Sequence, residues 1–131
     1  MDLQKKQFTF KGKTVDELKT LEVREFANYV KSRKKRTILR QFSDIEKFIT
    51  LAKKKISKNK KIRVHNRDLI VVPEMVGMKV QIYNGKEFVP IDIVGEMLGH
   101  KFGEFALTRA RIQHGKAGVG STKGSKHKSK K

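Results

Sequence analysis

The fold is decided by the stretch MKVQIYNGKEFVPIDI, which spans residues 78–93. In its first half Met78, Val80 and Ile82 alternate with polar residues, and this period of two is typical of a strand with one buried face. Asn84-Gly85 follows, a dipeptide that favours a two-residue hairpin turn in which both positions need a positive φ. The pattern therefore predicts an antiparallel hairpin at the centre of a sheet.

The return strand is predicted over 87–93. Phe88 and Ile91 are its candidates for the buried face. Pro90 cannot donate a hydrogen bond to a neighbouring strand, so this strand is expected at a sheet edge or with a bulge. A short helix, GEMLGH at 95–100, should follow it.

Upstream of the hairpin the period is also two. Ile62 and Val64 alternate with basic residues, and the apolar run 69–72 is stopped by Pro73. These segments extend the predicted sheet, and the compact unit is expected to cover about 62–106. A unit of about 45 residues is only marginally stable alone.

The residues before 60 have helical spacing instead. Thr14 and Glu17 form a capping box before a bent helix or two short helices over 14–32, with a break at 20–22. A second capping box, Ser43 with Glu46, precedes a helix over 44–57. One face of that helix is apolar and should pack against the sheet: Ile45, Phe48, Ile49, Ala52 and Ile56. The fold class is α+β, with N-terminal helices followed by a small, hairpin-centred mixed sheet, a short helix and a disordered basic C-terminal tail.

The charge is extreme and unevenly distributed. The chain has 131 residues and a formal net charge of +19. Basic residues without acids cluster at 31–40, at 53–63 and after Glu104, whereas 67–104 is nearly neutral. Clusters of this kind around a neutral core are typical of nucleic-acid binding. We expect a basic helical extension over 1–60, a sheet-containing core over 61–110 and a flexible basic tail over 111–131.

Other classes of protein are disfavoured. The chain has no cysteine, which excludes disulfide frameworks and cysteine-ligated zinc sites. No apolar run approaches the length of a membrane span, so we expect an intracellular protein without a membrane association. The four histidines lack metal-ligand spacing, and Glu96 four residues before His100 is a weak catalytic pair. We expect no enzyme and no cofactor. A DNA-compacting protein and a nucleic-acid-processing enzyme remain the alternatives.

The segment 65–109 resembles a known family in unbroken register. The motifs that carry the resemblance are PEMVG at 73–77, YNGK at 83–86, FVPI at 88–91, EMLGHKFGEF at 96–105 and Thr108-Arg109. They are similar to the universal small-subunit ribosomal protein numbered nineteenth in the bacterial series. The helical N-terminal region resembles the archaeal and eukaryotic branch of that family.

The resemblance implies a structural constituent of the cytoplasmic ribosome. Such a protein binds the 3′ major domain of small-subunit ribosomal RNA in the head and lies beside the small-subunit protein numbered thirteenth. Its basic tail reaches toward the decoding region and the A-site transfer RNA. The residues expected to bind ribosomal RNA, of which those before residue 60 are inferred from charge alone, are Arg33, Lys34, Lys35, Arg36, Arg63, Arg67, Lys79, Lys86, His100, Lys101, Arg109 and Arg111. The residues expected near transfer RNA are His114, Lys116, Lys123, Lys126 and Lys128.

Overall fold

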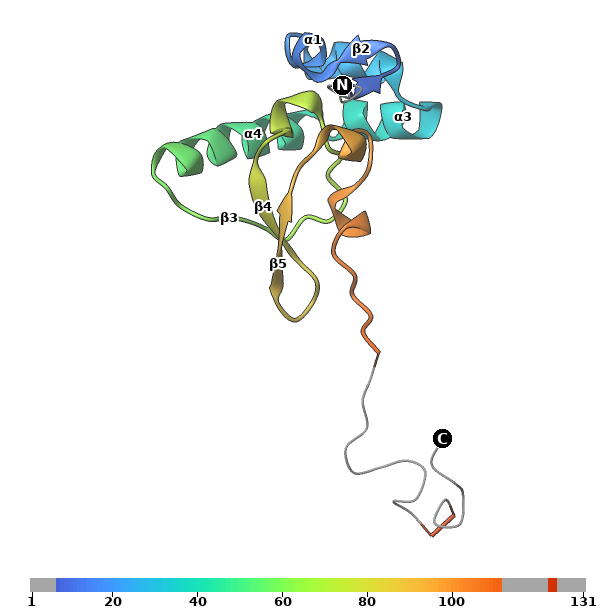
Figure 1. Ribbon diagram of the computed structural model, residues 1–131, viewed down its shortest axis with the longest axis vertical. Helices are drawn as coiled ribbons and strands as arrows, with labels where there is room; N and C mark the ends of the chain where they lie inside the picture. The colour runs from blue at the N-terminus through green and yellow to red at the C-terminus, as the bar shows by residue number, and fades with distance from the viewer. Residues whose placement is uncertain (1–6, 112–122, 125–131) are drawn as a thin grey trace, which may run out of the picture.

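The computed structural model describes residues 7–111 and 123–124, and it has the predicted α+β architecture (Figure 1). Its α-helices are α1 (Val15–Lys19), α2 (Val23–Phe26), α3 (Ser32–Arg40) and α4 (Phe42–Ser57). Its strands are β1 (Thr9–Phe10), β2 (Lys13–Thr14), β3 (Ile62–Val64), β4 (Lys79–Tyr83) and β5 (Phe88–Asp92). Single 3-10 turns η1 (Ala27–Tyr29), η2 (Pro73–Met75), η3 (Gly95–Met97) and η4 (Phe102–Glu104) complete the described elements.

The first helices follow the predicted capping pattern. The Glu17 amide donates to the Thr14 hydroxyl at 3.4 Å, and the Thr14 amide donates to the Glu17 carboxylate at 2.9 Å. The predicted break at 20–22 separates α1 from α2. A second reciprocal cap, between Glu22 and Glu25, starts α2. Two short helices therefore form, each begun by its own side chains.

The basic run 31–40 falls between the two predicted helical segments, 14–32 and 44–57, but residues 32–40 form helix α3. Only Ile38 of this helix is buried, so one residue fixes its inner face. The predicted Ser43–Glu46 capping box before α4 is wrong. Gln41 donates to the Thr37 carbonyl and accepts from the Ile45 amide, both at 2.9 Å, so α4 has already begun when the chain reaches Ser43.

The inner face of α4 is mostly as predicted. Ile45, Ile49 and Ala52 are buried and Phe48 is partly buried against the core. Ile56 is the exception, with 47% of its surface exposed. It lies in the last turn of α4, beyond the reach of the core.

The central sheet is mixed, in the order β3-β4-β5. Strand β3 is parallel to β4, and β4 is antiparallel to β5. The predicted alternation is confirmed, because Ile62, Val64, Val80 and Ile82 are all buried. Strands β1 and β2 form a separate two-stranded ribbon. Figure 1 shows the helices gathered at one end of the central sheet and the turn of the hairpin projecting from the other end.

The hairpin is confirmed, but its predicted two-residue turn is wrong. Tyr83 pairs with Phe88, which leaves a four-residue connection at 84–87. Gly85 has a φ of +97°, whereas Asn84 has none of the positive φ that the predicted turn requires. The Asn84 side chain instead accepts hydrogen bonds from the amides of Lys86 and Glu87, at 2.9 and 2.8 Å. This side chain replaces the backbone geometry of the shorter turn.

The remaining predictions for the hairpin concern the position and the buried face of strand β5. It is an edge strand, as Pro90 requires. Ile91 pairs with Val80 and packs against the core, as predicted. Phe88 does not, because it is an odd number of positions away from Ile91 and so lies on the opposite face of the strand.

The apolar run 69–72 is buried and is held by the chain that follows the sheet. The Val71 amide donates to the His100 carbonyl at 2.9 Å, and the Phe102 amide donates to the Leu69 carbonyl at 3.0 Å. After strand β5, the predicted helix at 95–100 is reduced to the single turn η3. The C-terminal part of the described chain is thus fastened to the core by its backbone.

One hydrophobic core includes residues from both halves of the chain. Leu18, Phe26 and Ile38 from the helices are completely buried in the same cluster as Val80 and Phe102. Among the described residues, every fully buried side chain is hydrophobic. The expectation of a compact unit restricted to 62–106 is therefore wrong, because the helices complete that core.

Candidate nucleic-acid interface

Helix α3 presents most of its cations on one outward face. Successive residues of an α-helix are about 100° apart, so Arg33, Arg36 and Arg40 lie on the side opposite Ile38. Lys35 and the exposed Leu39 border them. With Ser32, these five side chains line a shallow hollow of about 710 Å³. We call this surface the α3 basic face. It can neutralise several phosphates of a polyanion without burying a charge.

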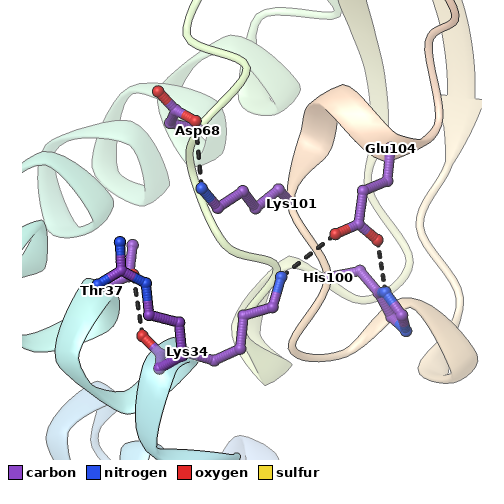
Figure 2. Close-up of polar contacts among 7 residues, drawn as sticks. Lys34, Thr37, Asp68, His100, Lys101 and Glu104 are labelled. Atoms are coloured by element: carbon purple, nitrogen blue, oxygen red, sulfur yellow. Dashed lines mark hydrogen bonds and ion pairs between the residues drawn. The ribbon is translucent and has the colours of Figure 1, made fainter.

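Lys34, by contrast, faces the body of the protein. It lies four residues before Ile38 and therefore on the same side of α3. Its Nζ donates to Glu104 Oε1 at 3.2 Å, and Glu104 Oε2 is 2.6 Å from His100 Nδ1 (Figure 2). Lys101 Nζ donates to Asp68 at 3.3 Å. Lys34, His100 and Lys101, which are all predicted to bind RNA, thus contact carboxylates of the same protein.

Glu104 is the centre of this network. Partial burial raises the pKa of its carboxyl, but hydrogen bonds from His100 and Lys34 and a backbone hydrogen bond with Lys101 outweigh burial, so the pKa lies below its usual range. Glu104 is therefore ionised at neutral pH, and it fastens the turn η4 to helix α3.

Arg67 is the most internally engaged of the predicted residues. Its Nη1 donates to the Tyr83 carbonyl at 2.6 Å, and its Nη2 donates to the Gly103 carbonyl at 2.8 Å and to the Ala106 carbonyl. The Gly103 amide donates back to the Arg67 carbonyl at 2.9 Å. One guanidinium thus joins the end of β4 to the segment after the sheet. Of its five N–H donors, two remain for a ligand.

The outer face of the sheet combines charge with aromatic rings. Arg63 is exposed on β3, with its guanidinium 5.2 Å from the Phe88 ring centre and its Nε 3.3 Å from Gln81 Oε1. Lys79 is exposed on β4 at 3.9 Å from Asp92, and Lys86 is exposed in the hairpin turn. Sequence reasoning found these cations but missed the aromatic cluster. The alternation of the strands could have revealed it, because positions 63, 65, 83 and 88 fall on the face opposite the buried residues.

Sequence reasoning also missed a groove beside β3. It has a volume of about 500 Å³ and lies between the end of the basic run 53–63 and the sheet. The groove is lined by Ile56, Asn59, Lys60, Lys61, Ile62, Gly77, Met78, Lys79 and Gln81. Lys60 and Lys61 thus meet Lys79 from a distant part of the sequence.

The predicted residues nearer the C-terminus are only partly described. Arg109 and Arg111 are exposed and follow η4 in the chain. Lys123 is exposed in a turn. His114, Lys116, Lys126 and Lys128 lie outside the described residues.

The described part of the chain gives little basis for catalysis. Within residues 7–111 and 123–124, no three His, Asp or Glu side chains are placed to hold a metal ion. His100 contacts Glu104 and not Glu96, so the structure does not form the Glu96–His100 pair that the sequence suggested. No helix in the described segments is long and apolar enough to cross a membrane.

Comparison with known proteins is consistent with this cationic surface. The model of the ribosomal protein S19 family matches residues 31–114. The chain is 45% identical over 123 residues to small ribosomal subunit protein uS19 of Methanococcoides burtonii, covering 94% of this chain and 88% of that protein. It is 42% identical over 124 residues to small ribosomal subunit protein uS19 of Methanocella arvoryzae, covering 95% and 87%.

Both relatives are archaeal, and alignments of this length must include most of the helical N-terminal region. The predicted archaeal or eukaryotic type of chain is thereby confirmed. Members of the matched family are structural, non-enzymatic components of the cytoplasmic small ribosomal subunit that bind ribosomal RNA and serve translation. With more than half of its residues in the family model and two such relatives, this chain belongs to the ribosomal protein S19 family.

Proposed function

We propose that this protein binds the 3′ major domain of small-subunit ribosomal RNA in the head of the subunit. The α3 basic face carries the proposal, because its arginines and lysine are exposed on one side of a single helix that is fastened to the core. A-form RNA offers phosphates and 2′-hydroxyls more readily than base edges. Cations on a rigid helix suit such a backbone.

The remaining predicted residues fall into two groups in this proposal. Arg63, Lys79, Lys86, Arg109 and Arg111 are exposed and extend the contact from α3 to the sheet and the C-terminal segment. Within this first group, Arg63 also contacts Gln81 and Lys79 lies 3.9 Å from Asp92. The second group combines a contact to RNA with hydrogen bonds to Glu104, to Asp68 or to backbone carbonyls, and it consists of Lys34, Arg67, His100 and Lys101. The first group should therefore dominate affinity.

The salt dependence of binding tests the α3 basic face. Log affinity falls with log salt by about 0.7–0.9 for each phosphate neutralised, so the R33Q/K35Q/R36Q variant should lose about 2–3 units of slope on a transcript of the 3′ major domain. K11Q/K19Q/K47Q removes the same charge from exposed positions elsewhere. Equal slopes for the two variants, measured by fluorescence anisotropy between 50 and 400 mM salt, would refute the assignment.

We further propose that the three segments of the chain divide the work. Residues 1–60 add basic helices to the contact with RNA, residues 61–110 carry the sheet, and residues 111–131 approach the A-site transfer RNA. The small-subunit protein numbered thirteenth in the bacterial series is the proposed neighbour. The resemblance of 65–109 to the family supports these assignments, together with the eight Lys and Arg residues that follow Glu104.

Replacing Lys116, Lys123, Lys126 and Lys128 with glutamine tests the role of the tail. We expect subunits reconstituted with this variant to assemble normally and to bind A-site transfer RNA more weakly. Assembly would be measured by sedimentation and transfer-RNA affinity by filter binding. A failure to assemble would show that the tail serves the scaffold instead.

A further inference from the structure

The outer face of the central sheet carries three aromatic rings in mutual contact. The ring centres of His65 and Tyr83 are 4.8 Å apart, those of His65 and Phe88 are 5.1 Å apart, and those of Tyr83 and Phe88 are also 5.1 Å apart. Arg63 places its guanidinium 5.2 Å from the Phe88 ring centre. We call these four residues the aromatic platform.

We propose that the aromatic platform binds an unpaired base of RNA by stacking. This inference rests on the proposed binding of ribosomal RNA. It adds the kind of RNA group that is bound, which is a base extruded from a helix and not a phosphate alone. Aromatic rings and arginine planes on a sheet can stack against any base, since every base has a π face.

The platform is placed for a ligand and is not needed to close the core. His65 is exposed, Tyr83 and Phe88 are half-buried, and the buried cluster lies on the opposite face of the same strands. The Tyr83 hydroxyl donates to the Gly85 carbonyl at 2.9 Å, which fixes the ring against the hairpin turn. A ring held in this way loses little freedom when a base stacks on it.

Charge around the platform favours RNA over a protein partner. Besides Arg63, Lys86 is exposed in the adjoining hairpin turn, and Lys61 and Lys79 are exposed toward the other end of β3 and β4. The two acids in this region are Glu87 in the turn and Asp92, which is already 3.9 Å from Lys79. A polyanion that also presents flat apolar groups matches this surface, and single-stranded RNA is such a polyanion.

The chain supplies its own spectroscopic probe. It contains no tryptophan and two tyrosines, Tyr29 and Tyr83, so Y29F leaves Tyr83 as the single fluorophore of the full-length protein. We expect an adenylate octamer to quench Tyr83 fluorescence on binding. Inorganic polyphosphate, which carries charge without bases, should bind without quenching. The matched control is Y83F, in which Tyr29 reports the same titration and should stay unchanged.

Affinity gives a second, independent measurement. The H65L/F88L variant keeps apolar cover on the sheet but removes two rings, and it should bind the octamer about tenfold more weakly. F42L removes a ring that lies 4.4 Å beneath Arg24 elsewhere in the molecule, and it should bind like wild type. Y83F keeps its ring and should also bind like wild type.

The outcomes separate this inference from the proposed function. Unquenched Tyr83 fluorescence in Y29F that has bound the octamer would overturn the stacking proposal, even with normal binding to the 3′ major domain transcript. Equal affinities of H65L/F88L and F42L would overturn it too and would leave the platform as a protein contact or a support for the sheet. If H65L/F88L does not fold, quenching in Y29F alone decides. Loss of binding to the transcript, by contrast, concerns the proposed function.

Discussion

Replacing Arg67 with lysine tests whether this side chain holds the fold together. Arg67 lies between the sheet and the C-terminal segment and donates to the carbonyls of Tyr83, Gly103 and Ala106. Lysine keeps the positive charge but replaces a planar fork with a single ammonium group. It can reach one of the three carbonyls and leaves the others without this donor.

The expected loss of stability follows from these contacts. A hydrogen bond from a charged donor contributes about 1.5–3 kcal/mol to stability. Two lost bonds would sum to about 3–6 kcal/mol, but contacts that share one group are not additive, and water reaches this partly exposed site. We therefore expect R67K to lower the free energy of unfolding by about 3 kcal/mol.

Urea unfolding followed by circular dichroism measures this loss. With a slope of about 1.5 kcal/mol per molar urea, 3 kcal/mol moves the midpoint by about 2 M. R33K is the matched control, because Arg33 is exposed on the α3 basic face, and its midpoint should move by less than about 0.3 M. A midpoint of R67K as close to wild type as that of R33K would refute the structural role and return Arg67 to the surface contacts.

Three further changes test other parts of the structure. The lowered pKa of Glu104 means that its contacts contribute stability above the ordinary carboxyl value of 4.5 and lose it as the pH falls through the lower folded value. E104Q should thus lower the melting temperature at pH 7 and change it much less at pH 3. The loss of unfolding free energy at pH 7 should stay under about 1 kcal/mol, because the side chain is 42% exposed. An equal drop in melting temperature at both pH values would contradict this. In G77A the added Cβ has no atom within 4 Å, but the residue must adopt a φ of +92°. Backbone strain alone should therefore lower the free energy of unfolding in urea by about 1–2 kcal/mol, and an unchanged midpoint would mean that the turn relaxes. I38A should cost about 2–5 kcal/mol and keep a single calorimetric transition, because α3 shares the core with the sheet; two transitions would show that the helices fold separately.

The sheet was predictable because its information is local. The alternation at 78–82 and the proline at position 90 determine which face is buried and which strand lies at the edge, without reference to distant residues. The turn was harder, since Asn84 can satisfy the chain either through its backbone conformation or through its side chain. The sequence does not say which, and the structure uses the side chain.

Helix α3 was missed because its signal is weak. It contains one buried residue, and its start at Ser32 has no side-chain cap. A run of six cations in ten positions reads as solvated, and only packing of Ile38 against the core distinguishes a helix from an extended tail. That packing depends on partners that are remote in the sequence.

The candidate site shows the same limit more sharply, because charge in a sequence does not reveal which charges are already used. Lys34 and Lys35 are adjacent and chemically identical, yet a rotation of about 100° sends one to Glu104 and the other to solvent. Glu104, the acid that pairs with Lys34 and not with Lys35, lies 70 positions after Lys34 in the chain. The Glu104 carboxylate already neutralises part of the charge of Lys34, so Lys34 attracts a phosphate less strongly, whereas an exposed lysine gives up only water and counterions. Lys35 should therefore contribute more to RNA affinity than Lys34, and comparing K34Q with K35Q on the 3′ major domain transcript measures that difference directly. A larger loss of slope for K34Q would mean that the Glu104 contact opens when RNA binds.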